Sequence, residues 1–138
     1  MAEQPQKVAS RPLSPSLTIY RWPVTMATSI IHRMTGVALA GGTLLIAWWL
    51  LAVASGPETF NFLNSTIATP LGQLVLFGFV WALAYHFLNG IRHLAWDFGY
   101  GFPVATANKT GITVIALSLL LAAGAFALVY LGKGGYYQ

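Results

Sequence analysis

The chain has 138 residues, of which 57% are hydrophobic and only 7% are charged. Soluble domains carry about 25% charged residues, so this composition excludes an ordinary soluble domain and indicates a membrane protein. The seven basic residues give a net charge of +4 but form no dense cluster, which argues against nucleic-acid binding and favours contact with anionic membrane lipid.

Residues 1–22 are predicted to form a cytoplasmic N-terminal arm. Lys7, Arg11 and Arg21 are scattered among prolines and serines, with no apolar core before a small-residue cleavage site. The first ten residues hold one lysine and one glutamate, which is atypical of a mitochondrial transit peptide. A bacterial inner-membrane protein is therefore the simpler interpretation. The X-Pro pairs in the arm favour extended backbone that would lie against a partner protein.

Residues 23–57 are predicted to form an interfacial helix that continues into the first membrane span. Pro23 suits the first turn of a helix. Residues 25–35 mix polar and apolar side chains, so this part would run along or through the membrane interface; an ordinary amphipathic helix is the alternative. Met34–Pro57 carries no charge and exceeds the roughly 20 residues that a helix needs to cross about 30 Å of hydrocarbon.

Two more uncharged stretches, Leu71–Ile91 and Gly111–Leu131, are also long enough to cross a bilayer. We place span two at residues 70–94 and span three at residues 109–131. The sequence thus predicts an all-α membrane protein, a single anchor domain of three transmembrane helices with an N-terminal interfacial segment.

The two connections between the spans differ in charge. Ser55–Pro70 is turn-rich, and Trp96–Asn108 contains two glycines and a proline that break helices. With three spans, one side of the membrane receives Lys7, Arg11, Arg21, Arg33, Arg92 and Lys109, and the other receives only Lys133. The positive-inside rule then predicts a cytoplasmic N-terminus and a periplasmic C-terminus.

His86 lies inside span two, where hydrocarbon offers an imidazole no hydrogen bond. Such a ring must be paired, hydrogen-bonded or bound to a metal. Its helical neighbours include Ala82 and Gly90, so a flat group such as haem can approach the helix there. The chain has no cysteine, which excludes thiolate metal sites and iron–sulfur clusters held by this chain. A hydrogen bond to a neighbouring helix explains His86 equally well at this point.

Other polar residues gather toward the cytoplasmic end of the same helices. They are Ser29, His32 and Arg33 near span one, and Asn89, Arg92, His93 and Asp97 on span two. His86 and His93 share a helix face but lie about 10.5 Å apart, so they cannot be opposed ligands of one iron, whose nitrogens would be about 4 Å apart. A six-coordinate haem would therefore take its second ligand from another chain.

Simpler explanations hold for several of these residues. Arg92 and His93 at a helix end are typical of snorkelling or of groups that compensate the helix dipole. Asp97 would either take up protons from the cytoplasm or pair with Arg92 or His93, and the pairing is slightly favoured.

Three segments carry a family resemblance. Arg11–Pro23 and Ser29–Gly36 closely resemble the N-terminal signature of the cytochrome b subunits of succinate dehydrogenase, and Tyr85–Asp97 resembles their second signature. The resemblance implies a complex in which a flavoprotein oxidises succinate, an iron–sulfur subunit carries electrons, and two small membrane chains provide the haem b and ubiquinone sites. The succinate-oxidising site would then lie outside this chain.

By motif position, the resemblance makes His86 an axial ligand of haem b, with the second ligand on the other membrane chain. Ser29 and Arg33 match quinone-site residues, and His32 with Arg33 lies where haem propionates are approached. The Ser29 hydroxyl would donate to a ubiquinone carbonyl, and Arg33 would stabilise negative charge on the quinone or pair with a propionate. The alternatives are a fumarate reductase anchor, a haem-free structural anchor, and a transporter subunit that uses His86 as a proton relay.

Overall fold

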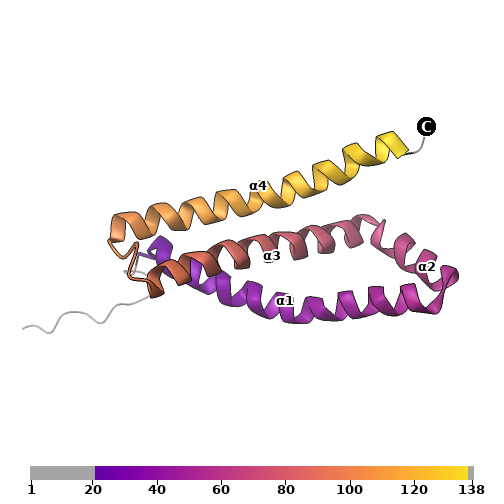
Figure 1. Ribbon diagram of the computed structural model, residues 1–138, viewed down its shortest axis with the longest axis horizontal. Helices are drawn as coiled ribbons and strands as arrows, with labels where there is room; N and C mark the ends of the chain where they lie inside the picture. Colours follow the sequence, from indigo (N-terminus) through magenta and orange to yellow (C-terminus); the bar gives the residue numbers. More distant parts are fainter. Residues whose placement is uncertain (1–20, 137–138) are drawn as a thin grey trace, which may run out of the picture.

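The computed structural model describes residues 21–136, with the side chains of 21–132. These residues form four helices, and no strand occurs among them: α1 (Val24–Ser55), α2 (Pro57–Ile67), α3 (Pro70–Asp97) and α4 (Val104–Tyr136) (Figure 1). The arm predicted for residues 1–22, which holds the first signature segment, lies almost entirely outside the described residues.

Three of the four helices are long and apolar enough to cross a membrane, which confirms the predicted fold class. The interfacial helix and span one form a single helix, α1, of 32 residues. At 1.5 Å per residue such a helix is about 48 Å long, well beyond the roughly 30 Å of a hydrocarbon core. Its polar N-terminal turns can therefore extend past the hydrocarbon without a break in the helix.

The first connection is more ordered than the sequence prediction. Eleven of its residues form α2, which lies between Pro57, at the start of α2, and Thr69, which precedes α3. Gly56 has a φ of 103° and ends α1, after which Pro57 occupies the start of α2. The Thr69 side chain then accepts a hydrogen bond from the Gly72 amide and caps α3. The turn residues of this segment therefore mark the ends of a short helix rather than a loop.

The second connection is shorter than predicted. Helix α3 continues through Asp97, beyond the expected end at residue 94, and α4 begins at Val104, five residues before the expected start at 109. Gly99 and Gly101 both have φ of 87°, so the predicted glycine break is confirmed but is confined to residues 98–103. Because helices can extend into the headgroup region, an estimate from uncharged stretches alone places their ends too close to the membrane centre.

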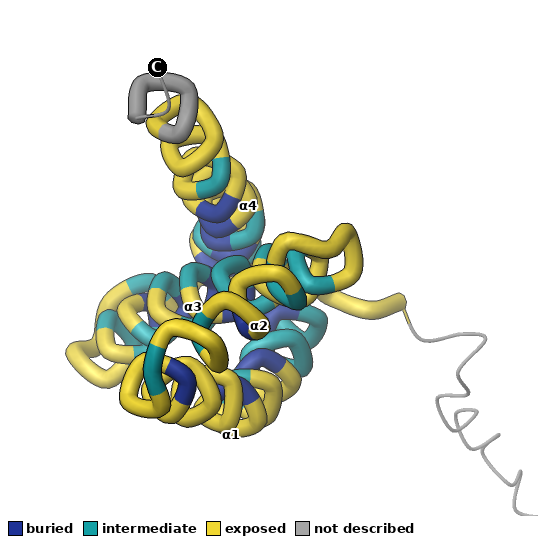
Figure 2. Tube along the Cα trace, turned by 90° about the vertical axis from the view of Figure 1, so that its right-hand side faces the viewer, coloured by how far each residue is buried: buried dark blue, intermediate teal, exposed yellow. Residues whose placement is uncertain are grey.

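Figures 1 and 2 show α1 and α3 side by side, with α4 along α3 and α2 at the far end of the pair. The start of α1, the end of α3 and the start of α4 meet at one end of the molecule, which we call the polar end. The C-terminal part of α4 projects away from the other helices in both views. Most large apolar side chains are exposed, as expected where lipid rather than water covers the surface.

The buried interior of the described residues is small and partly polar. Besides seven apolar residues it contains Thr28, Thr35, Asn89, Arg92 and Ser118. Close helix contact depends on small residues: the Phe79 ring of α3 occupies the place that a side chain at Gly42 of α1 would need. The Trp81 indole donates to the Ser118 hydroxyl at 3.2 Å and links α3 to α4. Small residues and hydrogen bonds of this kind are how helices associate in lipid.

Candidate functional site

The three histidines of the described chain form one column near the polar end. The His32 ring of α1 stacks on His86 of α3, with ring centroids 3.9 Å apart and planes inclined by 12°. Its other side faces His93, at 4.9 Å and 21°. His32 thus fills the space between two histidines that lie two turns apart on α3. Among residues 21–136, no group of three or more His, Asp or Glu side chains is arranged to hold a metal ion.

The His86 ring is tied to α1 through its Nδ1 atom. Nδ1 lies 3.2 Å from the His32 carbonyl oxygen and 3.3 Å from the Thr35 hydroxyl oxygen. Gly36 makes this approach possible, since a Cβ there would lie 3.1 Å from Cε1 of the His86 ring. A carbonyl oxygen only accepts hydrogen bonds, so the bond to His32 places the proton on Nδ1. Nε2 then keeps its lone pair and has no hydrogen-bond partner among the described residues.

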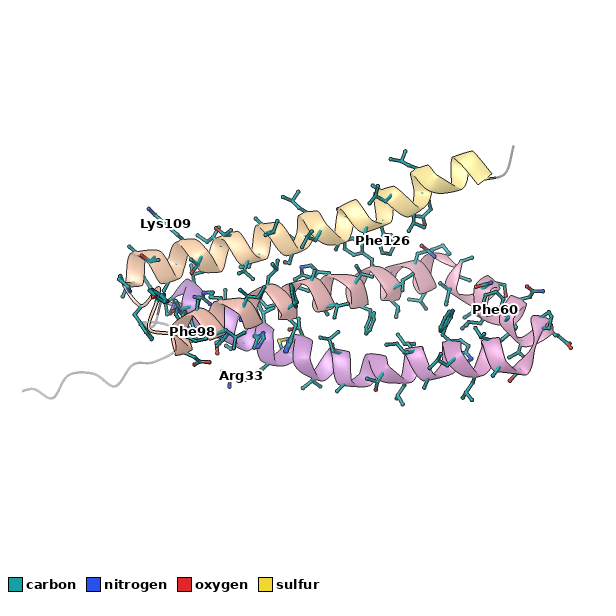
Figure 3. The ribbon with its side chains drawn as sticks, in the orientation of Figure 1. Arg33, Phe60, Phe98, Lys109 and Phe126 are labelled. Atoms are coloured by element: carbon teal, nitrogen blue, oxygen red, sulfur yellow. The ribbon has the colours of Figure 1, made fainter. Side chains whose placement is uncertain are left out.

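Ser29 and Arg33 lie one turn apart on the outer side of α1, as their spacing predicts. Arg33 Nε and Nη2 are 3.4 and 3.5 Å from the Ser29 carbonyl and hydroxyl oxygens. These distances are at the long limit for hydrogen bonds, so the interaction is weak. Figure 3 shows Arg33 pointing away from the other helices. Both residues are therefore available to a ligand or a partner chain.

Arg92 points inward rather than snorkelling to the surface. Its guanidinium donates four hydrogen bonds, to Thr110 Oγ1 (3.1 Å), Thr28 Oγ1 (3.2 Å), Asn89 Oδ1 (3.2 Å) and the Ala107 carbonyl (2.9 Å). It also lies 4.1 Å from the centre of a Trp96 ring, a cation–π contact. All these partners are uncharged, and they belong to α1, α3 and α4. Arg92 therefore joins the three long helices at the polar end.

Asp97 and His93 have separate surroundings. Asp97 is exposed and forms no ion pair with Arg92 or His93 within the described residues, so the pairing favoured from the sequence is not formed. Nδ1 of His93 is 2.7 Å from the Asn89 carbonyl of its own helix, and the ring packs edge-on against Trp96 at 5.1 Å. Arg92 and His93 thus share the neighbours Asn89 and Trp96, whereas Asp97 is paired with neither of them.

Tyr85 is a site residue that the sequence reasoning missed. Its side chain is fully buried, and its hydroxyl donates to the Thr28 carbonyl at 2.8 Å. Tyr85, Asn89 and Arg92 recur at four and three residues, the spacing of one helix face, and all three are buried. That spacing was a signal available in the sequence. This second stripe of α3 holds the segment of α1 that begins at Thr28.

Comparison with known proteins matches this arrangement to a family. A family model described as the succinate dehydrogenase/fumarate reductase transmembrane subunit matches residues 7–125. The chain belongs to this family. It is 45% identical over 113 residues to the succinate dehydrogenase cytochrome b556 subunit of Paracoccus denitrificans, covering 82% of this chain and 87% of the relative. The family resemblance of the three signature segments is thereby confirmed.

Relatives occur in bacteria and in mitochondria. The cytochrome b556 subunit of Rickettsia felis is 42% identical over 111 residues, which cover 80% of this chain and 86% of the relative. The mitochondrial cytochrome b560 subunit of Sus scrofa is 40% identical over 124 residues, which cover 87% of this chain and 72% of the relative. With its three apolar helices, the chain is a membrane-anchor subunit of the succinate dehydrogenase type, and thus part of an oxidoreductase complex.

A groove in this transmembrane subunit begins beside His86. It has a volume of about 570 Å³ and is lined by α1 and α3, including Thr35, which contacts His86, and Ala82, one turn before it. Its lining is almost wholly apolar, and it includes Gly41 and Gly78, which have no side chains to fill the groove. Sites for cofactor-sized molecules occupy about 300–1,000 Å³ and are mostly apolar. The groove therefore has the size and the apolar lining that suit a flat apolar cofactor, and His86 lies beside it without lining it.

Proposed function

We propose that this subunit helps to bind haem b through His86 and contributes Ser29 and Arg33 to a ubiquinone-reduction site. The observation that carries the haem assignment is the bonding of His86: Nδ1 is held by the His32 carbonyl while Nε2 is unpartnered among the described residues. Histidines that bind metals commonly donate their other ring nitrogen to such an oxygen. The names of the relatives, cytochrome b556 and b560, support the same assignment.

The second axial ligand would come from the other small membrane subunit. His93 is unsuitable because His32 stands between its ring and that of His86. Haem b, when bound, supplies a one-electron centre within the membrane. Among the residues of this chain, His86 would bind the iron, and Arg33, exposed beside His32, would offer a cation to the propionates. Nδ1 of His32 is buried without a hydrogen-bond partner in the described chain.

Ser29 and Arg33 suit the recognition of a quinone. The Ser29 hydroxyl can donate to a quinone carbonyl, and the Arg33 guanidinium remains cationic and stabilises the negative charge that reduction brings. Their weak mutual bonds mean that a ligand displaces little when it binds. Asp97, exposed at the same end, is suited to take up protons from water for this reaction, whereas Arg92 and His93 are engaged within the chain.

The remaining parts of the assembly follow from the same family. We assign succinate oxidation to a flavoprotein subunit and electron transfer to an iron–sulfur subunit, because this chain has no cysteine to hold a cluster. The distribution of the basic residues supports a cytoplasmic location for the polar end and the N-terminus. The high identity to a bacterial relative supports an inner-membrane location with a periplasmic C-terminus.

Replacing His86 with Leu tests the haem assignment in the assembled complex. We expect the reduced-minus-oxidised b-type absorption to be lost while the complex still oxidises succinate with an artificial dye. An unchanged spectrum and haem content would refute the assignment. It would favour a haem-free anchor, in which the bonds from His86 to α1 serve only to join two helices.

Replacing Ser29 with Ala tests the quinone assignment. Loss of one hydrogen bond of about 0.5–1.5 kcal/mol should lower succinate:quinone activity about 2–10-fold. Succinate oxidation by a dye should not change. Ser65→Ala is a matched control, because that serine lies on α2 and bonds only to a carbonyl of its own helix at 2.8 Å. Equal losses in both assays, or in both variants, would contradict a quinone role for Ser29.

A further inference from the structure

A hydroxyl group on α1 contacts the proposed haem ligand and is not explained by helix packing alone. The Thr35 side chain is buried, and its Oγ1 lies 3.3 Å from Nδ1 of His86. The same oxygen is 2.9 Å from the His32 carbonyl, one turn earlier on α1. The Thr35 hydroxyl therefore contacts both the backbone of α1 and the ring of His86.

The direction of these bonds follows from the number of hydrogens. A threonine hydroxyl has one hydrogen and two lone pairs. Since the His32 carbonyl can only accept, the Thr35 hydrogen is used in that bond, and the oxygen turns a lone pair toward His86. Nδ1 of His86 thus faces two acceptors, the carbonyl at 3.2 Å and the hydroxyl at 3.3 Å. Neither can donate to it, so both hold the tautomer in which Nδ1 carries the hydrogen.

Both acceptors lie on α1, whereas the ring lies on α3. The two acceptor oxygens lie 2.9 Å apart and face the same ring nitrogen, so together they restrain the rotation of the imidazole more than one would. Gly36 leaves just enough room for this arrangement, because any Cβ at that position would crowd the ring. The face of the ring is covered by His32. The ring is thus restrained by contacts from residues 32–36, little more than one turn of the same helix.

We infer that Thr35 is a positioning residue that fixes the tautomer and the orientation of His86 for iron binding. This inference rests on the proposed function of His86 as a haem ligand. A hydrogen-bond acceptor at the far nitrogen of a ligating histidine raises the basicity of the ligand, and loss of such a partner typically lowers metal affinity 10–100-fold. Thr35 supplies one of two such acceptors.

The experiment compares Thr35→Val, Thr35→Ser and Thr43→Val in the assembled complex. Valine keeps the shape but removes the hydroxyl, and serine restores it. Thr43 is the matched control, since it lies on α1 and bonds to a carbonyl three residues earlier, Ala40 at 2.6 Å, but has no histidine contact among the described residues. Transfer of haem to an excess of an apo-haemoprotein and the haem midpoint potential are measured, together with succinate oxidation by a dye.

We expect Thr35→Val to lose haem about tenfold faster. Its potential should become more positive, because a less basic ligand stabilises ferric iron less. Thr35→Ser and Thr43→Val should behave as the unaltered complex. If Thr35→Val lowers the yield of complex but leaves the potential and the haem loss rate unchanged, Thr35 has only a structural role and the inference is wrong. His86→Leu separates the two claims: retention of haem in that variant would instead overturn the proposed ligand itself.

Discussion

The contacts of the Arg92 guanidinium predict that this residue contributes strongly to the stability of the folded chain. Replacing Arg92 with Lys keeps the positive charge but offers one nitrogen in place of three. The single lysine nitrogen cannot reach acceptors on three helices at once, so two or three of the four hydrogen bonds are lost, along with the contact to Trp96. Hydrogen bonds in membrane helices contribute about 0.6 kcal/mol each, and a cation–π contact about 0.5–2 kcal/mol. The expected loss is therefore about 2–4 kcal/mol.

The measurement is the free energy of unfolding of the full-length chain in mixed micelles, titrated with sodium dodecyl sulfate and followed by tryptophan fluorescence. Arg33→Lys is the matched control, since Arg33 is exposed and its two contacts on α1 are weak. It should change stability by no more than about 0.5 kcal/mol. Equal effects of the two substitutions would show that Arg92 does not join the helices in the way its contacts indicate.

Two glycine substitutions test the close contacts, and each is paired with a substitution at a glycine in open space. Gly36→Ala should lower the haem content of the assembled complex, because the new Cβ would lie 3.1 Å from the His86 ring, whereas Gly124→Ala, with open space around it, should not; equal haem content in both would contradict this. Gly72→Ala should destabilise the chain by about 1–3 kcal/mol, as its Cβ would lie 2.5 Å from a backbone oxygen of α2. Gly78→Ala should stabilise it by up to about 1 kcal/mol in the same unfolding titration, and a loss there would refute the packing described.

The membrane spans could be predicted because one physical requirement dominates them. A bilayer demands about 20 uncharged residues per helix, and three stretches of this chain meet that demand. This criterion does not apply outside the hydrocarbon. It therefore could not predict that residues 104–108 belong to α4 or that α3 continues to Asp97. Helix α2 escaped prediction for a related reason: eleven residues with mixed polarity carry too short a pattern to separate from a loop.

The candidate site could be predicted along each helix but not between helices. Spacing alone placed Ser29 with Arg33, and His86 with His93, on common faces. It could not show that His32 would stand between His86 and His93, because that depends on the relative register of α1 and α3. Nor does spacing reveal which way a long arginine turns at a helix end.

The two stripes of α3 explain how a polar site can exist at the membrane with few charges. One stripe, with His86, meets α1 at residues 32–36; the other, with Tyr85 and Arg92, meets α1 at Thr28. Both stripes of α3 therefore contact the same two and a half turns of α1. Every hydrogen bond between α1 and these stripes has an uncharged group on at least one side. Such bonds hold Nδ1 of the half-buried His86 imidazole and the buried guanidinium without a buried carboxylate, whose desolvation would be costly. Because α1 is held from its inner side, Arg33 on its outer side stays exposed, as the proposed quinone role requires.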